Sequence, residues 1–250
     1  MTDLITRQQA RSYDDAVYGP RSYDYWLWCL ERVYLLQVLE RQFGAKRPRY
    51  LDFACGSGRV IVVLEGGRVA ESTGIDVSSS MLELARAKLQ WSRIVEGDAT
   101  EDPSLLEGPY DLITAFRFFL NAEDALRARA LAVLHEALAD DGLLILNIHG
   151  NATSLRGLSL LARRFRRRPP LGSTPRQLSL AGARRLLHRH GFEVTEVSGF
   201  GVLTERLHRL AGPSLHRRLQ RLVAFGAMRY LAIDLVLVCR KRGRAEKEIT

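Results

Sequence analysis

Cysteine is scarce in this sequence, with three residues in 250. Cys29, Cys55 and Cys239 are an odd number and lie far apart, so they form neither a disulfide framework nor the closely spaced pairs of a zinc site. We therefore expect reduced, unpaired thiols, no metal ligands and a cytoplasmic protein.

Long hydrophobic runs are also missing. A membrane-spanning helix needs roughly 18 apolar residues, and the best stretch, residues 231–239, is interrupted by Asp234. The first ten residues, MTDLITRQQA, lack the apolar core of a secretory signal. We predict no transmembrane span, and 250 residues with 46% hydrophobic content suit one large domain with additions.

Acidic residues are few in the C-terminal part of the chain. Residues 1–150 hold 16 Lys and Arg against 22 Asp and Glu, a net charge of −6, whereas residues 151–250 hold 21 against 6, or +15. Such a basic portion attracts phosphate-bearing partners, which include nucleic acid, a nucleotide-linked small molecule and an anionic membrane face. A solvated arginine-rich surface is the alternative.

The hydrophobic pattern alternates between strand and helix without an internal repeat. Strands separated by helices imply parallel crossovers and a doubly wound α/β sheet. Before the first strand, residues 25–42 have a helical pattern that ends at Gly44. The predicted strands are 50–53, 73–76, 93–95, 110–115 and 143–148, and the predicted helices between them are 58–64, 79–89 (capped by Ser79 or Ser80) and 122–138, with a turn at Asp141-Gly142.

The stretch YLDFACGSGRV, residues 50–60, ends the first of these strands. Gly56 and Gly58 let the backbone approach a ligand closely. A dinucleotide fingerprint would have a further glycine where Ile61 stands, and the Gly-Lys-Ser/Thr of a P-loop is absent. What remains is Asp52, a glycine turn and Asp76 at the end of the next strand, where a carboxylate can accept hydrogen bonds from the vicinal hydroxyls of a ribose.

Three motifs in order carry a family resemblance: Leu51 to Gly58, then Gly74-Ile75-Asp76-Val77-Ser78, then Glu96-Gly97-Asp98-Ala99. Together they resemble the class I S-adenosylmethionine-dependent methyltransferases, over about residues 45–150 and more weakly beyond. The resemblance implies a mostly parallel seven-stranded sheet flanked by helices with an antiparallel last strand, an N-terminal helical cap, a C-terminal helical insertion, and S-adenosylmethionine as cofactor.

The resemblance also assigns roles to residues. Asp52, Ala54, Gly56 and Gly58 would surround the methionine part, and Ala54 departs from the glycine that many members have there. Asp76 would bind the ribose and Asp98 the adenine amino group; turn formation and capping are the alternatives for these acids. The remaining predicted cofactor contacts are Val77, Met81, Ala99 and Phe116.

Candidates for catalysis follow the fourth and fifth strands. His149 is the one histidine expected at a strand's carboxyl end, and an imidazole suits a proton acceptor near neutrality; ordering the loop is the alternative role. Arg117 could grip a phosphate or carboxylate of the acceptor, with Asn121 nearby. The adjacent phenylalanines, residues 116, 118 and 119, would wall the apolar part of the acceptor or belong to the core.

The expected reaction is methyl transfer to a small or carrier-linked anionic acceptor, and the expected target is a hydroxyl of a phosphate-bearing carbohydrate or natural-product intermediate. Sequence patterns for nucleobase amines (Asn/Asp-Pro-Pro-Tyr/Phe) and for pyrimidine carbon-5 (Pro-Cys) are absent. An RNA methyltransferase and a non-catalytic cofactor-binding protein are the alternatives.

We expect a helical cap at 1–44 and a cofactor-binding domain at 45–250. That domain carries a basic loop insertion at 161–177 and an amphipathic helical insertion at 203–228. The latter insertion could cover the site, dimerise or contact an anionic membrane peripherally. The oligomeric state stays open.

Overall fold

The structure is a computed structural model that describes residues 12, 17, 19–154, 157–158, 177–203, 205–210, 213–224 and 226–243. The basic stretch 161–177 therefore lies, apart from its last residue, outside the described residues. The strands are β1 (Arg49–Phe53), β2 (Glu71–Asp76), β3 (Arg93–Glu96), β4 (Tyr110–Ala115), β5 (Leu138–His149), β6 (Phe192–Phe200) and β7 (Asp234–Lys241). The helices are α2 (Tyr23–Phe43), α3 (Ile61–Leu64), α4 (Ser79–Arg86), α5 (Phe118–Asn121), α6 (Asp124–Ala137), α8 (Leu180–Arg189), α9 (Glu205–Leu210) and α10 (Pro213–Ala224), with short 3-10 turns η1 (Pro103–Leu105) and η2 (Ala227–Leu231).

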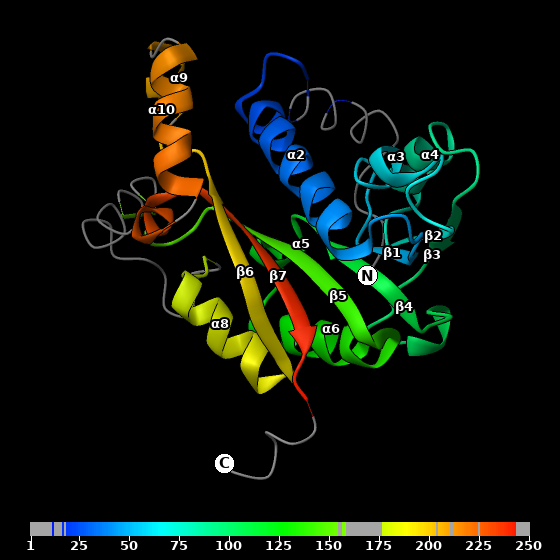
Figure 1. The fold of residues 1–250 in the computed structure, drawn as a ribbon. Coiled ribbons are helices and arrows are strands. Elements are labelled where there is room, and N and C mark those ends of the chain that lie inside the picture. The colour runs from blue at the N-terminus through cyan, green and yellow to red at the C-terminus, as the bar shows by residue number, and fades with distance from the viewer. Residues whose placement is uncertain are drawn as a thin grey trace, which may run out of the picture.

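The seven strands form one sheet in the order β3-β2-β1-β4-β5-β7-β6 (Figure 1). β1 pairs in parallel with both β2 and β4, so the strand order reverses between β1 and β4. β7 pairs antiparallel with β5 on one side and with β6 on the other, and it is the one strand that runs against the other six. The predicted doubly wound sheet with an antiparallel last strand is confirmed.

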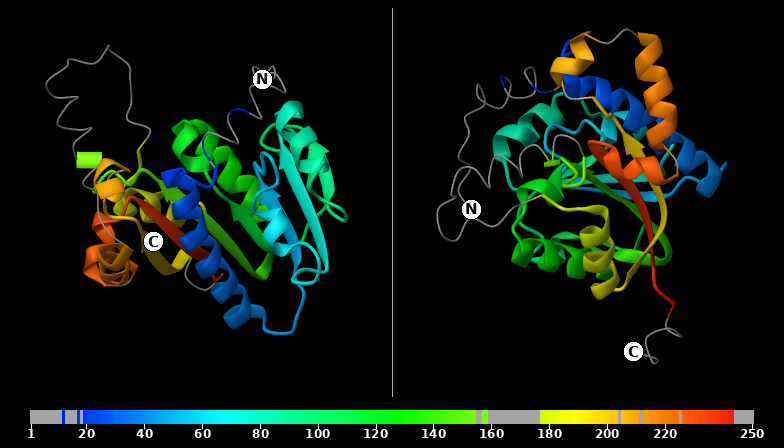
Figure 2. Two further views of the ribbon diagram at one scale, coloured as in Figure 1. Left: turned by 90° about the horizontal axis from the view of Figure 1, so that it is seen from above. Right: turned by 90° about the vertical axis from the view of Figure 1, so that its left-hand side faces the viewer.

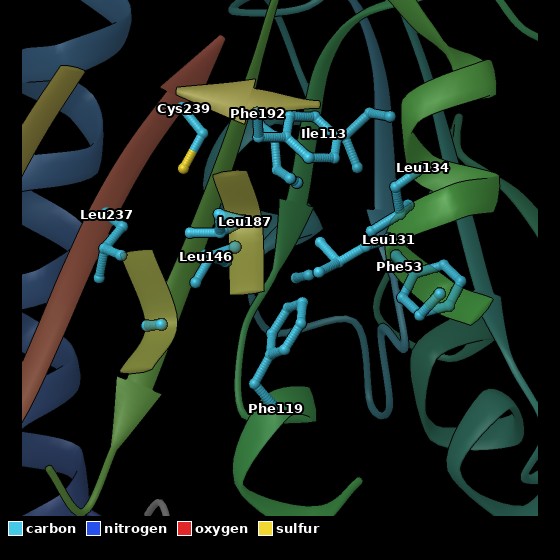
Figure 3. Close-up of a cluster of buried hydrophobic side chains, with 14 of the residues drawn as sticks. Phe53, Ile113, Phe119, Leu131, Leu134, Leu146, Leu187, Phe192, Leu237 and Cys239 are labelled. Atoms are coloured by element: carbon cyan, nitrogen blue, oxygen red, sulfur yellow. The ribbon is translucent and has the colours of Figure 1, made fainter. Parts of the chain in front are cut away.

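Helices cover both faces of the sheet (Figure 2). On one face, Leu27 and Val38 of α2 are fully buried in a cluster with Ile61 of α3 and Val236 of β7. On the other face, α6 and α8 pack on the sheet, and Figure 3 shows their leucines among side chains of β1, β4, β5, β6 and β7. Burying both faces explains why the central strands are almost continuously apolar.

Helix α2 begins at Tyr23, where the Ser22 side chain accepts a hydrogen bond from the Tyr25 N–H, and ends at Phe43, with Gly44 as its C-cap. It starts two residues before the predicted helix. Its buried side chains recur at helical spacing and share the core of the sheet, so α2 is a structural layer of the fold. The predicted division of the chain at residue 44 stays a prediction.

Two local predictions were wrong. Ser78, and not Ser79 or Ser80, caps α4, because its side chain accepts from the Met81 N–H. Asp141-Gly142 is no turn between helix and strand, since β5 already begins at Leu138 beside Tyr110 and the pairing register then shifts before Leu112 meets Leu143. The extra residues of β5 form a bulge within the strand, at the position where a turn was predicted.

The insertion predicted at 203–228 contains α9, α10 and the start of η2, between β6 and β7. Among the described residues we find no helix that combines the length and the apolar character needed to cross a membrane.

Candidate active site

A cavity of about 390 Å³ lies at the carboxyl ends of β1, β2 and β4, beside the reversal in strand order. Open α/β sheets place ligands at this position, and the volume suits a small organic molecule. Ten of the thirteen predicted site residues line it: Ala54, Gly56, Asp76, Val77, Met81, Asp98, Ala99, Phe116, Arg117 and Asn121. Asp52, Gly58 and His149 do not.

The turn after β1 is held in left-handed backbone conformations. Gly56 has φ +53° and Gly58 has φ +75°, and Ala54 has φ +57°. A Cβ on Gly58 would lie 3.0 Å from Leu89 Cδ1 and 3.2 Å from Ala85 Cβ, so this glycine lets the turn pack on the α4 region. Gly56, by contrast, faces the cavity.

Asp76 ties the turn to the next strand. Its Oδ2 accepts from the Gly56 N–H at 2.8 Å, and its Oδ1 accepts from the Ser78 N–H at 2.9 Å. Each carboxylate oxygen can accept more than one hydrogen bond, so the group is oriented and still able to receive ligand hydroxyls. We refer to residues 54–58 with Asp76 and Asp98 as the glycine-turn side of the cavity.

Asp98 is oriented by its own loop. Its Oδ1 accepts from the Thr100 N–H at 2.9 Å and from the Thr100 hydroxyl at 2.7 Å. Asp98 thus caps its own loop, which is the alternative role given for this acid, and it still lies on the cavity wall. Its predicted contact with adenine stays a prediction.

Asp52 lies beneath the turn, with 2% of its surface exposed. Its Oδ1 accepts from the Thr114 hydroxyl at 2.6 Å, and the Tyr50 hydroxyl lies 2.7 Å from the same Thr114 oxygen. Burial raises the pKa of Asp52 from 3.8 to about 7. This geometry suits an acid that supports the turn, and its predicted contact with the ligand stays a prediction.

Across the cavity, Arg117 joins the lining to a group of polar residues that we call the polar cluster: Asp24, Glu31, Arg117, Asn147, His149 and Asp234. Arg117 has φ +63°, a strained conformation for a residue with a side chain. The Asn147 side chain stabilises it, accepting from the Arg117 N–H at 2.6 Å and donating to Glu31 Oε1 at 3.0 Å. Glu31 and Asn147 are both fully buried.

His149 is held by Asp234, the first residue of β7. The distance from His149 Nδ1 to Asp234 Oδ1 is 2.6 Å, and Asp234 is fully buried. Arg117 Nη1 also lies 2.7 Å from His149 Nδ1 and 3.0 Å from Asp24 Oδ1. Nδ1 cannot both donate to Asp234 and accept from Arg117: in the tautomer with the proton on Nδ1, His149 donates to Asp234, and Arg117 donates to Asp24 and not to the ring. In that tautomer Nε2, which lies 3.7 Å from Asp24 Oδ1, carries the lone pair.

The charges of the polar cluster shift the ionisation of its acids. Burial, and then the charge of Asp234, raise the pKa of Glu31 from 4.5 to about 7. Burial opposes ionisation of Asp234 as well, but His149 and Arg117 outweigh it and lower the pKa of Asp234. Glu31 therefore holds a proton more readily than Asp234 does.

Sequence reasoning placed His149, Arg117 and Asn121 but missed Asp24, Glu31, Asn147 and Asp234. Arg117 is not the isolated cation that a grip on phosphate needs, because Asp24 lies at 3.0 Å and Asp234 at 3.6 Å from its guanidinium. Two signals were present: Asp234 interrupts an apolar strand, and Glu31 occupies a position on the buried stripe of α2. The Asn121 side chain donates to the Arg117 carbonyl at 3.0 Å.

Comparison with known proteins agrees with this geometry. Residues 51–142 match the sequence model of a methyltransferase domain. A protein of Geobacillus sp. (strain WCH70) named as a methyltransferase is 33% identical over 151 residues, which are 58% of this chain and 58% of the relative. An uncharacterised methyltransferase of Oceanobacillus iheyensis is 29% identical over 56% of this chain and 63% of its own length. The chain thus matches less than two thirds of each relative.

Solved structures show the same fold. The magnesium protoporphyrin IX methyltransferase of Synechocystis PCC 6803, with bound SAH, superposes with a TM-score of 0.62 at 17% identity, over 95% of this chain and all of the other. Residues 51–142 therefore form a methyltransferase domain, within a chain that has the class I fold, and the resemblance read from the sequence is confirmed.

Proposed function

We propose that this chain, built around a methyltransferase domain, transfers the methyl group of S-adenosylmethionine to a hydroxyl group of a small or carrier-linked acceptor. The fit of the cofactor rests on the cavity: a turn without side-chain bulk at Gly56, and two oriented carboxylates, Asp76 and Asp98, on the wall. When bound, the cofactor supplies a methyl group already activated by its sulfonium. What the chain must supply is alignment, exclusion of water and a proton acceptor.

The observation that carries the hydroxyl assignment is the His149–Asp234 pair. With its Nδ1 proton directed at Asp234, the imidazole presents Nε2 as a base, and the buried carboxylate stabilises the imidazolium that forms. The His149 side chain is 13% exposed and contacts Arg117, which lines the cavity. In this mechanism His149 Nε2 would take the hydroxyl proton, and the cofactor held beside Asp76 and Asp98 would supply the methyl group, its carbon–sulfur bond breaking so that a neutral thioether leaves.

We further propose that the acceptor is anionic, a phosphate-bearing carbohydrate or natural-product intermediate. The support is the net charge of +15 on residues 151–250. Arg117 contributes less to this attraction than its charge suggests, because two carboxylates balance it.

The first prediction tests the base. His149→Ala should lower the single-turnover rate of methyl transfer by about 10² to 10⁴, because proton abstraction is lost, with cofactor affinity unchanged. Asp234→Asn should lower the rate comparably, since an amide that donates to Nδ1 moves the imidazole proton to Nε2. The assay uses labelled S-adenosylmethionine with a panel of phosphorylated hydroxyl compounds, and calorimetry measures cofactor affinity.

His188→Ala is the matched control, because His188 is exposed on α8 and makes no contact with the polar cluster. If the His149→Ala rate equals that of the parent at every pH, His149 is not the base. If cofactor binds tightly but no compound is methylated by the parent, the non-catalytic alternative gains support. Turnover of RNA alone would favour the RNA methyltransferase.

A further inference from the structure

Helix α10 has one face that packs on the domain and one that does not. Gln220 of the inner face donates to the Gly199 carbonyl at 2.8 Å and accepts from the Gly201 N–H at 3.0 Å, and Val223 is 1% exposed. On the outer face, Leu215 and Leu222 are two helical turns apart and remain 48% and 55% exposed. A helix that only covered its own domain would bury its leucines.

Large exposed apolar side chains gather in this part of the chain. Nine are found among the described residues, and five of them fall within residues 210–230: Leu210, Leu215, Leu222, Met228 and Tyr230. Leu210 is 85% exposed. Such a concentration marks an interaction surface, whereas single exposed leucines would need no explanation.

Basic residues flank these leucines. Arg218 and Arg221 are exposed on the outer face of α10, with Arg218 one turn from each of Leu215 and Leu222. Residues 203–230 hold six arginines and one acid, Glu205, for a net charge of +5. At Arg218 and Arg221 the outer face of α10 therefore combines apolar area with positive charge.

This surface lies at the same end of the fold as the cavity. Figure 1 shows α9 and α10 beyond the end of the sheet at which β6 terminates. The His208 ring of α9 packs on Tyr23 at 5.0 Å and on Trp26 at 4.6 Å between ring centroids, and the Tyr23 hydroxyl donates to the Leu203 carbonyl at 2.7 Å. The next residue of α2, Asp24, pairs with Arg117 of the cavity wall.

We infer that the outer face of α10, together with Leu210 at the end of α9, docks on an anionic membrane surface. Leucines that insert at the level of the acyl chains and arginines that pair with lipid phosphates are the combination by which interfacial helices bind. An RNA backbone would use the arginines but give the leucines no apolar partner. A second copy placed by a twofold axis would bring like charges together across the contact.

The inference also concerns the acceptor, and that part rests on the proposed function. An acceptor carried by a lipid would reach the cavity from the surface on which the enzyme lies. Docking itself does not depend on methyl transfer. The two ideas can therefore fail separately.

The test is co-sedimentation of the whole chain with vesicles of phosphatidylcholine, alone or mixed with phosphatidylglycerol. We expect binding to the anionic vesicles only, weakened by added salt. Leu215→Gln with Leu222→Gln should reduce the partition coefficient about 10- to 30-fold, and Arg218→Gln with Arg221→Gln should do so comparably. Substitution of exposed residues leaves the fold intact, which thermal melting checks.

Two control pairs match these changes. Val33→Gln with Val62→Gln replaces side chains that are 49% and 47% exposed elsewhere, and Lys46→Gln with Arg47→Gln removes two exposed charges before β1. Both control proteins should bind vesicles as the parent does. The inference is overturned if the parent does not bind anionic vesicles, if the controls lose as much binding as the test pairs, or if the leucine pair has no effect. It is also overturned if the leucine pair instead abolishes a dimer in sedimentation velocity or RNA binding in a filter assay.

Discussion

The glycine-turn side of the cavity and the polar cluster opposite differ in how far along the chain their partners lie. Gly56 and Asp76 are 20 residues apart, and Asp98 binds Thr100 two residues later. In the polar cluster, Glu31 pairs with Asn147 across 116 residues and Arg117 pairs with Asp24 across 93. The first side is a product of local turns at strand ends, whereas the second exists only once the sheet and α2 have packed.

Of the changes that separate the two regions, the largest effect on binding is expected at Asp76, on the glycine-turn side, with the polar cluster left intact. Asp76→Ala should weaken S-adenosylmethionine binding by about 2 to 4 kcal/mol, because charge-assisted hydrogen bonds to the ribose are lost and the Gly56 turn is no longer anchored. Isothermal calorimetry measures the change. Asp140→Ala, which removes an exposed acid on β5, should leave affinity unaltered. Equal affinities for Asp76→Ala and the parent would remove Asp76 from the binding site.

The next effect concerns the free energy of unfolding, which the buried Glu31 of the polar cluster makes dependent on pH. The folded chain holds the Glu31 proton up to about pH 7, while an unfolded glutamate releases it near 4.5, so the free energy of unfolding falls as pH rises through this window. Glu31→Gln resembles the protonated side chain and cannot titrate. Its stability relative to the parent should therefore rise by about 2 to 3 kcal/mol between pH 4.5 and 7.

Urea unfolding of both proteins at several pH values measures this difference. Glu40→Gln is the matched control, because Glu40 lies on the same helix with an exposed side chain. Its stability should follow that of the parent across the range. Parallel curves for Glu31→Gln and the parent would show that the buried carboxyl does not titrate in this window.

The smallest expected effect concerns the contribution of the turn after β1, on the glycine-turn side, to the stability of the fold. Ala54 has φ +57°, which costs an alanine about 1 to 2 kcal/mol and a glycine almost nothing. Ala54→Gly should therefore stabilise the chain by about 1 kcal/mol, reduced somewhat by the greater freedom of glycine in the unfolded state. Ala128→Gly, within α6, should instead destabilise it by about 1 kcal/mol. A melting temperature that falls for both variants would contradict the strain at Ala54.

The same contrast explains what could be predicted from the sequence. Five strands and the turn were predictable because periodicity, glycines and strand-end acids are local signals, and the family resemblance added most of the ten lining residues. The roles of Glu31 and Asp234 were not predictable, because they arise only when β7 inserts beside β5 and α2 packs across the sheet. Of the polar cluster, Arg117 alone falls within the 51–142 match. The rest comes from parts of the chain for which the sequence offered no motif.

The buried Tyr50–Thr114–Asp52 chain of hydrogen bonds has a calorimetric consequence. With a pKa of about 7, Asp52 is partly protonated near neutrality, and the charges of Arg59 and Asp76 on the cavity wall already act on it. A cation that enters the cavity should likewise favour the carboxylate and expel a fraction of a proton. Its binding enthalpy should then change with the ionisation enthalpy of the buffer, and the slope of that dependence counts the protons released.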